Sequence, residues 1–228
     1  MTKFTNSSKE ISSIGITVFD GFDSLDVFGP YQTFFWLTKF SVERPVNLYL
    51  IGPKKNGTVT SMEGVPITPA FCYDDAPPLD LIFVPGGYGK DWDALVGGKS
   101  HPIYDFLKTR VTTDTLVCSV CVGALVLANA GLLKGYNCTT HWAVKKQLAS
   151  YPGVFVAPGF PRYVIDGKRI TGGGISSGLD ESLAIVEILR GAEMARKIQL
   201  IMQYAPDPPF NSGDPSVASA ATMYAVTN

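Results

Sequence analysis

LVCSVCVGALVLANAGLL, residues 116–133, is a run of 18 residues without a charge. That is about the minimum length of a transmembrane helix, but Ser119, Asn129 and two glycines interrupt the run. A β-branched segment followed by a helix-forming one is more typical of a buried strand that runs into a buried helix. We therefore expect a strand over residues 115–119 and a helix over residues 123–130.

Similar apolar runs lie on both sides of this stretch and alternate with segments of helical character. Expected strands cover residues 14–19, 46–51, 79–84 and 153–157, hairpins 58–70 and 163–171, and helices 23–40, 101–109, 141–150, 176–190 and 192–204, before a loop-like tail. Pro30 is expected close to its helix start, where proline is tolerated. The alternation predicts an α/β fold, a mostly parallel sheet with helices on both faces, with an α+β arrangement as the main alternative.

The composition indicates one globular domain over residues 1–228, with residues 1–12 as a flexible extension. Hydrophobic residues make up 46% and charged residues 17% of the chain, which can therefore bury a core. The net charge of −1 argues against nucleic acid or an anionic membrane surface as a partner. The polar N-terminus has no signal-peptide core, and four cysteines do not make a disulfide scaffold, so we expect a cytoplasmic protein with reduced thiols.

Residues 119–123, SVCVG, are a candidate nucleophile elbow. A buried strand ends, one small nucleophilic residue follows, and Gly123 opens a helix, where glycine allows a sharp turn. At the helix N-terminus, the dipole and the free N–H groups favour the thiolate of Cys121 over the thiol. The alternative is that Cys121 is a small apolar core residue.

Two further segments supply candidate partners for Cys121. Pro85-Gly86-Gly87-Tyr88-Gly89 follows the strand LDLIFV, and glycine amides in such a loop can face a developing negative charge; a plain turn is the alternative. Asp26 lies early in the first helix among apolar residues. Burial would raise the pKa of its carboxyl group and suit it to proton transfer, whereas an exposed acid would only stabilise the helix dipole.

Metal and redox interpretations are weaker. Cys118 and Cys121, with Cys138 and His141, form two ligand-like pairs at a spacing close to that of a zinc ribbon. The first pair lies in apolar sequence rather than in a loop, which argues against zinc. A strand residue and an elbow residue do not face each other, which argues against a disulfide between Cys118 and Cys121. We interpret His141 as a hydrogen-bonded residue at a helix start.

Together these residues resemble the ThiJ/PfpI superfamily, in the branch with a class I glutamine amidotransferase-like (flavodoxin-like) fold. The matching stretches are LDVFGP (25–30), PPLDLIFVPGGYG (77–89), SVCVGALVLANAGLL (119–133), TTHWA (139–143), ITGGGISSGLD (170–180) and QLIMQYAPDPPFNSGDP (199–215). They cover nearly the whole chain after residue 12. Within the superfamily, the chain is most similar to the isonitrile (isocyanide) hydratases.

This resemblance implies a lyase that adds water to an isocyanide. Cys121 would attack the terminal carbon of R–N≡C, and Asp26 would protonate the adduct and then help to activate water. Hydrolysis of the thioimidate gives an N-substituted formamide. The backbone N–H groups of Gly87 and Val122 would stabilise the developing charge, so neither a metal nor an organic cofactor is needed.

The chain differs from the hydratases at one position, and the resemblance also predicts partners and pocket residues. Hydratases carry Thr where this chain has Val122, so we expect weaker or altered activity. The implied partners are a small-molecule substrate and a second copy of the chain, as a homodimer. Candidate pocket residues are Gly86, Tyr88, His141 and Gly173.

Two other functions remain open. One is a related thiol enzyme of the glyoxalase or deglycase type, acting on 2-oxoaldehydes, although those enzymes usually carry Glu at the position of Asp26. The other is a non-catalytic ligand or redox sensor dimer that keeps Cys121 as an oxidisable thiol. A DNA-binding regulator is disfavoured by the lack of a basic patch.

Overall fold

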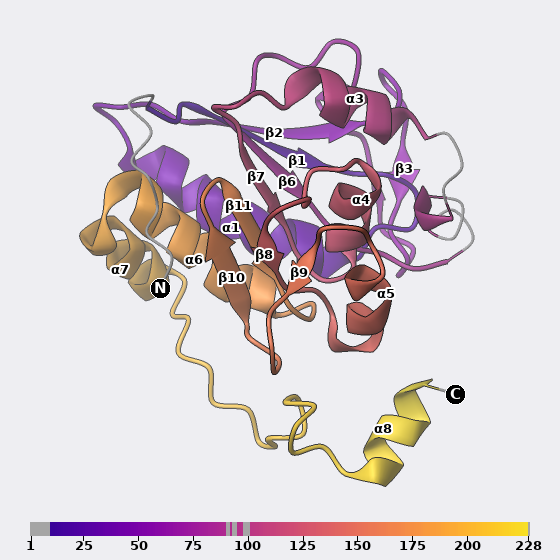
Figure 1. The fold of residues 1–228 in the computed structure, drawn as a ribbon. Helices are drawn as coiled ribbons and strands as arrows, with labels where there is room; N and C mark the ends of the chain where they lie inside the picture. Colours follow the sequence, from indigo (N-terminus) through magenta and orange to yellow (C-terminus); the bar gives the residue numbers. More distant parts are fainter. Residues whose placement is uncertain (1–9, 90–91, 93–94, 98–100, 228) are drawn as a thin grey trace.

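The structure, a computed structural model, describes residues 10–89, 92, 95–97 and 101–227. These residues form a seven-stranded central sheet with the order β10-β11-β7-β6-β1-β2-β5 (Figure 1). Its strands are β1 (Ser13–Thr17), β2 (Asn47–Gly52), β5 (Phe71–Cys72), β6 (Leu81–Val84), β7 (Leu116–Ser119), β10 (Tyr163–Asp166) and β11 (Arg169–Gly172). Neighbouring strands are parallel except β10, which is antiparallel to β11. The predicted α/β fold with a mostly parallel sheet is confirmed.

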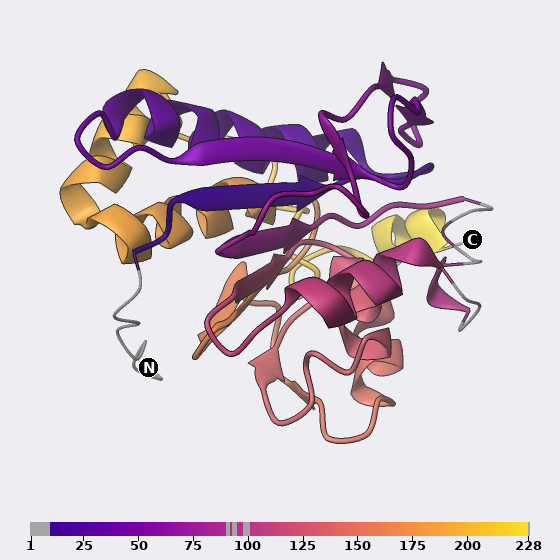
Figure 2. The same cartoon turned by 90° about the horizontal axis from the view of Figure 1, so that it is seen from above.

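Helices cover both faces of this sheet (Figures 1 and 2). One face carries α1 (Ser24–Phe40), α6 (Ser177–Arg190) and α7 (Ala192–Ile201), and the other carries α3 (Pro102–Arg110) and α4 (Gly123–Asn129), with α5 (Lys145–Ala149) beyond α4. The central strands β6 and β7 are buried at every position. Burial on both faces explains why their sequences are continuous apolar runs. Among the described residues, no helix combines the length and the apolar character that a membrane span requires.

Helix α1 begins where the sequence predicts, but its proline lies deeper than expected. Asp23 caps the helix, because its carboxylate accepts hydrogen bonds from the amides of Leu25 (3.0 Å) and Asp26 (3.3 Å). Pro30 lies in the second turn, and α1 continues to Phe40, so the expectation that Pro30 lies near the helix start was wrong. Pro30 is buried against α6, where a Cβ on Gly178 would lie 3.2 Å from its Cγ. This packing holds the helix together although Pro30 has no N–H for the Asp26 carbonyl.

Short elements account for most of the other differences from expectation. The predicted hairpin of residues 58–70 is confirmed as β3 (Val59–Thr60) and β4 (Pro66–Ile67). The predicted helix 141–150 divides into a 3-10 turn, Trp142–Val144, and α5, and the predicted strand 153–157 is only β9 (Phe155–Val156), paired with β8 (Asn137–Cys138) outside the main sheet. Sequence periodicity missed β5, β8 and α8 (Ala220–Thr227), which are too short to carry a pattern.

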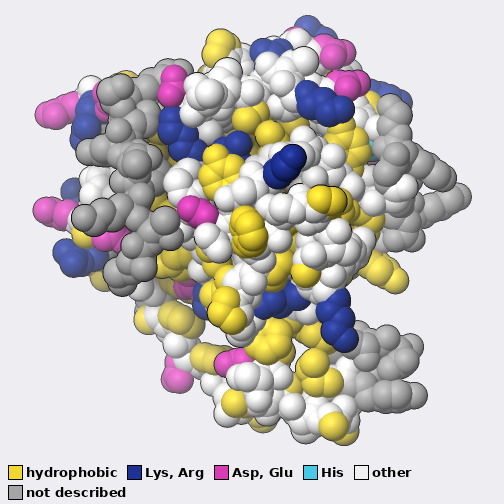
Figure 3. Space-filling view, viewed as in Figure 1, with side chains coloured by type: hydrophobic (Ala, Val, Ile, Leu, Met, Phe, Trp, Pro, Cys, Tyr) yellow, Lys and Arg dark blue, Asp and Glu magenta, His cyan; other side chains and the backbone are white. Residues whose placement is uncertain are grey.

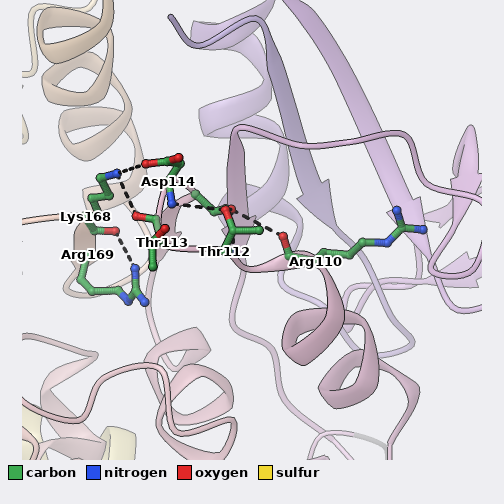
Figure 4. A network of polar contacts seen from close by, with 7 residues as sticks. Arg110, Thr112, Thr113, Asp114, Lys168 and Arg169 are labelled. Atoms are coloured by element: carbon green, nitrogen blue, oxygen red, sulfur yellow. Dashed lines mark hydrogen bonds and ion pairs between the residues drawn. The ribbon is translucent and has the colours of Figure 1, made fainter. Parts of the chain in front are cut away.

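The N-terminal extension and one loop are attached to the sheet in specific ways. Residues 1–9 of the predicted extension lie outside the described residues, whereas the Ser12 amide donates to Asp80 Oδ2 (2.9 Å). Lys168, in the β10–β11 turn, donates through Nζ to the Thr113 carbonyl (2.8 Å) and to Asp114 Oδ1 (2.9 Å), as Figure 4 shows. These bonds hold the loop before β7 against β11, and β7 is the strand that leads to Cys121.

Candidate active site

Cys121 occupies a sharp turn between strand and helix. β7 ends at Ser119, α4 begins at Gly123, and Cys121 lies between them with φ of 57°, in the left-handed region that a non-glycine residue rarely adopts. The Cys121 carbonyl accepts hydrogen bonds from Thr140 Oγ1 (2.7 Å) and from the His141 amide (3.3 Å). These contacts hold a conformation that costs about 1–2 kcal/mol in isolation. The predicted elbow geometry is therefore present.

Gly123 is required because the turn brings two chain segments together. A Cβ on Gly123 would collide with the Val84 carbonyl and lie 2.7 Å from the Pro85 carbonyl. The end of β6 therefore passes directly beneath the start of α4. This close approach brings the loop after β6, which holds Gly86 and Gly87, to the side of Cys121.

The Cys121 sulfur lies in a buried position beside one amide and one acid. Its side chain is 6% exposed, and the Val122 N–H donates a hydrogen bond to it. Burial and the neighbouring Asp26 charge raise the pKa of the thiol well above its usual value, and the Val122 amide opposes them. The sequence predicts that the helix N-terminus favours the thiolate, but burial outweighs that effect.

Asp26 is fully buried on the first turn of α1. Its Oδ2 accepts a hydrogen bond from the Gly86 amide (2.8 Å), and its buried Oδ1 has no partner among the described residues. Burial raises its pKa well above the usual value, with a further contribution from Asp23, whereas the bonds to Gly86 and Cys121 lower it. Because the two groups are buried side by side, two adjacent negative charges are disfavoured there and the titrations of Asp26 and Cys121 are coupled.

The other predicted residues divide between the site and its surroundings. Gly86 contacts the site, since a Cβ there would lie 2.8 Å from the Val122 nitrogen and 2.9 Å from Asp26 Oδ2. Gly87 forms an isolated antiparallel β-bridge with Phe22, and a Cβ on Gly87 would collide with the Gly21 carbonyl.

Tyr88 is 71% exposed, so its ring is on the surface. Gly173 lies beside the Pro161 carbonyl, and Gly174 is the glycine that faces the His141 ring, because a Cβ on Gly174 would lie 3.3 Å from His141 Cδ2. The place of Gly173 in a substrate pocket stays a prediction. The His141 ring caps the 3-10 turn, with Nδ1 accepting from the Ala143 amide (3.3 Å), as expected for a residue at a helix start.

Other constellations are less suited to chemistry. Cys72, Cys118, Cys121 and Cys138 are free thiols. Within the described part of the chain, no group of three or more His, Cys, Asp or Glu side chains could hold a metal ion. A cavity of about 520 Å³ lies between α6, α7 and β10 and is lined by Arg162, Asp180 and Tyr204, among others, but by none of the residues around Cys121.

Sequence reasoning missed three residues that belong to this region. Thr140 holds the Cys121 carbonyl, and it was visible only as part of the TTHWA stretch. Ser177 and Glu181, on α6, are buried polar residues without hydrogen-bond partners for their side chains among the described residues. A glutamate in an amphipathic helix ordinarily faces solvent, so no sequence signal marked Glu181 as buried.

Comparison with known proteins identifies the family of the chain. Residues 12–188 match the DJ-1/PfpI family, over a range that includes Asp26, Gly86 and Cys121. The chain belongs to the DJ-1/PfpI family. The predicted resemblance to the ThiJ/PfpI superfamily is therefore confirmed.

Individual relatives and one solved structure extend the comparison. The chain is 38% identical to an isonitrile hydratase of Pseudomonas putida over 92% of its own length and 86% of that enzyme. A crystal structure of a THiJ/PfpI family protein from Pseudomonas syringae superposes with a TM-score of 0.83 at 32% identity, covering 95% of this chain and 84% of the other. The chain is also 30% identical over 64% of its length to the transcriptional regulator GbdR of Pseudomonas aeruginosa, but spans only 38% of that regulator.

Proposed function

We propose that the protein is an isonitrile hydratase that converts an isocyanide and water into an N-substituted formamide. The observation that carries the proposal is the pairing of Cys121 with Asp26 under the Val122 amide. The likeness to the Pseudomonas putida isonitrile hydratase, which extends over 92% of this chain, supports the same reaction. A buried thiol and carboxyl group that share one proton are suited to a substrate that needs a nucleophile and an acid at one carbon.

The first step forms a covalent adduct. The Cys121 thiolate attacks the terminal carbon of R–N≡C, which forms a carbon–sulfur bond, while Asp26 delivers the shared proton to the same carbon. The product is a thioimidate, R–N=CH–S–Cys121, with Asp26 ionised. The Gly86 amide, 2.8 Å from Asp26 Oδ2, stabilises that carboxylate.

The second step uses the same carboxylate as a base. Asp26 takes a proton from water as the hydroxyl group adds to the thioimidate carbon, and then passes that proton to the nitrogen. When the carbon–sulfur bond breaks, the hydroxyl proton returns to Asp26 and R–NH–CHO leaves. Cys121 is again a thiolate, which the Val122 amide faces, so the cycle consumes only one water.

The test is incubation of the purified protein with cyclohexyl isocyanide, with the formamide measured by chromatography. We expect formamide from the wild type, none from Cys121→Ala, and a loss of at least about a hundredfold in Asp26→Asn. Methylglyoxal serves as a second substrate, and lactate formed without any formamide would replace this proposal with a glyoxalase. Undiminished turnover in Cys121→Ala would refute the covalent mechanism.

We further propose that the protein is a homodimer joined through its C-terminal arm, residues 205–227. The arm leads away from the body, and α8 lies apart from the rest of the fold in Figure 1. Almost all of its residues are exposed, including Phe210 at 78% and Val217 at 56%. Asp207 and Asp214 are its only charged side chains, and the space-filling view in Figure 3 shows hydrophobic side chains along it.

A short helix such as α8, with eight residues, has little stability alone in water. A second copy of the chain would supply the surface on which the arm packs. Light scattering after size exclusion should give a dimer mass for the full chain and a monomer mass after deletion of residues 205–228. A monomer for the full chain would refute the proposal. The four free thiols support a reducing compartment, and we infer that this is the cytoplasm.

A further inference from the structure

Glu181 is a buried acid that the mechanism above does not use. Its side chain is fully buried on α6, and neither carboxylate oxygen has a hydrogen-bond partner among the described residues. The hydroxyl group of Ser177, one turn earlier, is also buried and unpartnered within the described part of the chain. Native proteins rarely leave buried polar groups unsatisfied, and each such group calls for an explanation.

Both side chains converge on the end of β11. A Cβ on Gly172 would collide with Glu181 Oε2 and would lie 3.1 Å from both Ser177 Oγ and Val120 Cγ2. The absence of a side chain at Gly172 therefore makes room for the acid. Val120 directly precedes Cys121, so this polar cluster lies immediately behind the elbow.

The same cluster lies on the side of α6 that faces α1. The contacts between α1 and α6 follow the same order along the two helices. Pro30 packs on Gly178, and further along both helices Ser182 Oγ donates a hydrogen bond to Thr33 Oγ1 (2.9 Å). Asp26, one turn before Pro30, is therefore placed beside the start of α6. Its Oδ1 is the third buried group in this layer that lacks a partner among the described residues.

Burial and the surrounding charges both favour the neutral form of Glu181. Burial raises its pKa well above 4.5, and the Asp26 charge raises it further. The titratable groups that face Asp26 or Glu181 are Asp23 and Glu63 near the α1 start, Cys121 at the elbow and Cys118 on β7. All are acids, so none offers a counter-charge. A neutral carboxyl group is a hydrogen-bond donor, and buried polar groups of this kind commonly bind ordered water.

We propose that Glu181 is a positioning residue for Asp26: its neutral carboxyl group and the Ser177 hydroxyl hold buried water, which donates a hydrogen bond to Asp26 Oδ1 and keeps Oδ2 on the Gly86 amide. This arrangement gives each Asp26 oxygen one donor. It stabilises the carboxylate that forms when Asp26 gives its proton to the adduct. The inference rests on the proposed hydratase function for its catalytic consequence, but not for its effect on Cys121.

The first test measures alkylation of Cys121 by iodoacetamide against pH, with the labelled site identified by mass spectrometry. Loss of the donor to Asp26 raises the pH at which the Cys121–Asp26 pair loses its first proton. We expect the midpoint of the alkylation curve to move about one pH unit upward in Glu181→Leu. The matched control is Glu187→Leu, on the exposed side of the same helix, where the midpoint should not move.

The second test compares turnover with thermal stability. Glu181→Leu should lower kcat about tenfold with little change in KM, while the melting temperature stays the same or rises, because leucine removes the desolvation cost of a buried carboxyl group. Glu181→Gln, whose amide still hydrogen-bonds to water, should recover most of the lost kcat. A merely structural role for Glu181 would instead lower the melting temperature in Glu181→Leu.

The outcomes separate the two proposals. An alkylation midpoint in Glu181→Leu equal to that of the wild type would overturn the positioning role, as would equal losses of kcat in the Gln and Leu variants. If the wild type makes no formamide but the midpoint still moves, the hydratase proposal fails and the positioning role stands.

Discussion

Gly86→Ala is the change that most directly tests how Asp26 is held. The new Cβ would lie 2.8 Å from the Val122 nitrogen and 2.9 Å from Asp26 Oδ2, whereas ordinary contacts begin at 3.4 Å. Asp26 and Val122 must therefore each retreat by about half an ångström. That movement weakens the 2.8 Å bond from the Gly86 amide to Asp26 and the bond from the Val122 amide to the sulfur.

A hydrogen bond to a charged group contributes about 1.5–3 kcal/mol. Because about 1.36 kcal/mol corresponds to a tenfold change in rate, the loss of the Gly86–Asp26 bond should lower kcat/KM about ten- to a hundredfold. The added methyl group should also destabilise the fold by about 1–3 kcal/mol, as overpacking does. The assay is formamide production under initial-rate conditions, beside urea unfolding of the same preparation.

Gly29→Ala is the matched control on the same helix as Asp26. Its Cβ would meet Leu179 at 3.6 Å, an ordinary contact, so activity should be unchanged and α1 should gain up to about 1 kcal/mol. If folded Gly86→Ala keeps kcat/KM within about threefold of the wild type, Asp26 does not depend on the loop after β6. Such a result would refute a role for the Gly86–Asp26 hydrogen bond in proton transfer.

Cys121→Gly should be more stable to urea than Cys121→Ala by about 1 kcal/mol, because only glycine relaxes a φ of 57°; equal midpoints would mean that the elbow is unstrained. Thr140→Val removes the 2.7 Å bond to the Cys121 carbonyl, and should cost about 1 kcal/mol in urea unfolding and slow turnover. Val122→Thr should raise kcat/KM for isocyanides by placing a hydroxyl group beside the sulfur, and a decrease would show that the valine is favourable. Because the folded state raises the pKa of Glu181 above 4.5, it keeps a proton that the unfolded chain releases, so stability falls as pH rises above that value. Glu181→Gln should make this dependence on pH shallower above about pH 4.5, as measured by urea unfolding at a series of pH values.

The sequence predicts the central strands well, because a strand that is buried on both faces has a continuous apolar sequence. β6 and β7 are buried on both faces, so their apolar runs can be recognised in the sequence. Gly123 marks the turn between β7 and α4. The pairing of Cys121 with Asp26 is different, since it depends on how the start of α1 lies against the loop after β6 and the turn between β7 and α4. The apolar neighbours of Asp26 indicated a buried acid suited to proton transfer, and the family resemblance paired it with Cys121.

What escaped prediction lies where tertiary packing overrides local pattern. Pro30 is tolerated in the second turn of α1 because α6 packs on it. Glu181 is placed inside by the same packing, although its helix alone would put an acid in water. α8 has no amphipathic pattern from which it could be predicted, because it is short and carries no charged residue to mark an exposed face.

The depth of the Cys121 sulfur also determines what can attack it. With 6% of the residue exposed, a bulky disulfide such as oxidised glutathione cannot align with the sulfur for exchange. Mixed disulfides should therefore form slowly at this thiol even under oxidative stress. The fold thereby protects the thiol on which the proposed reaction depends from exchange with bulky disulfides.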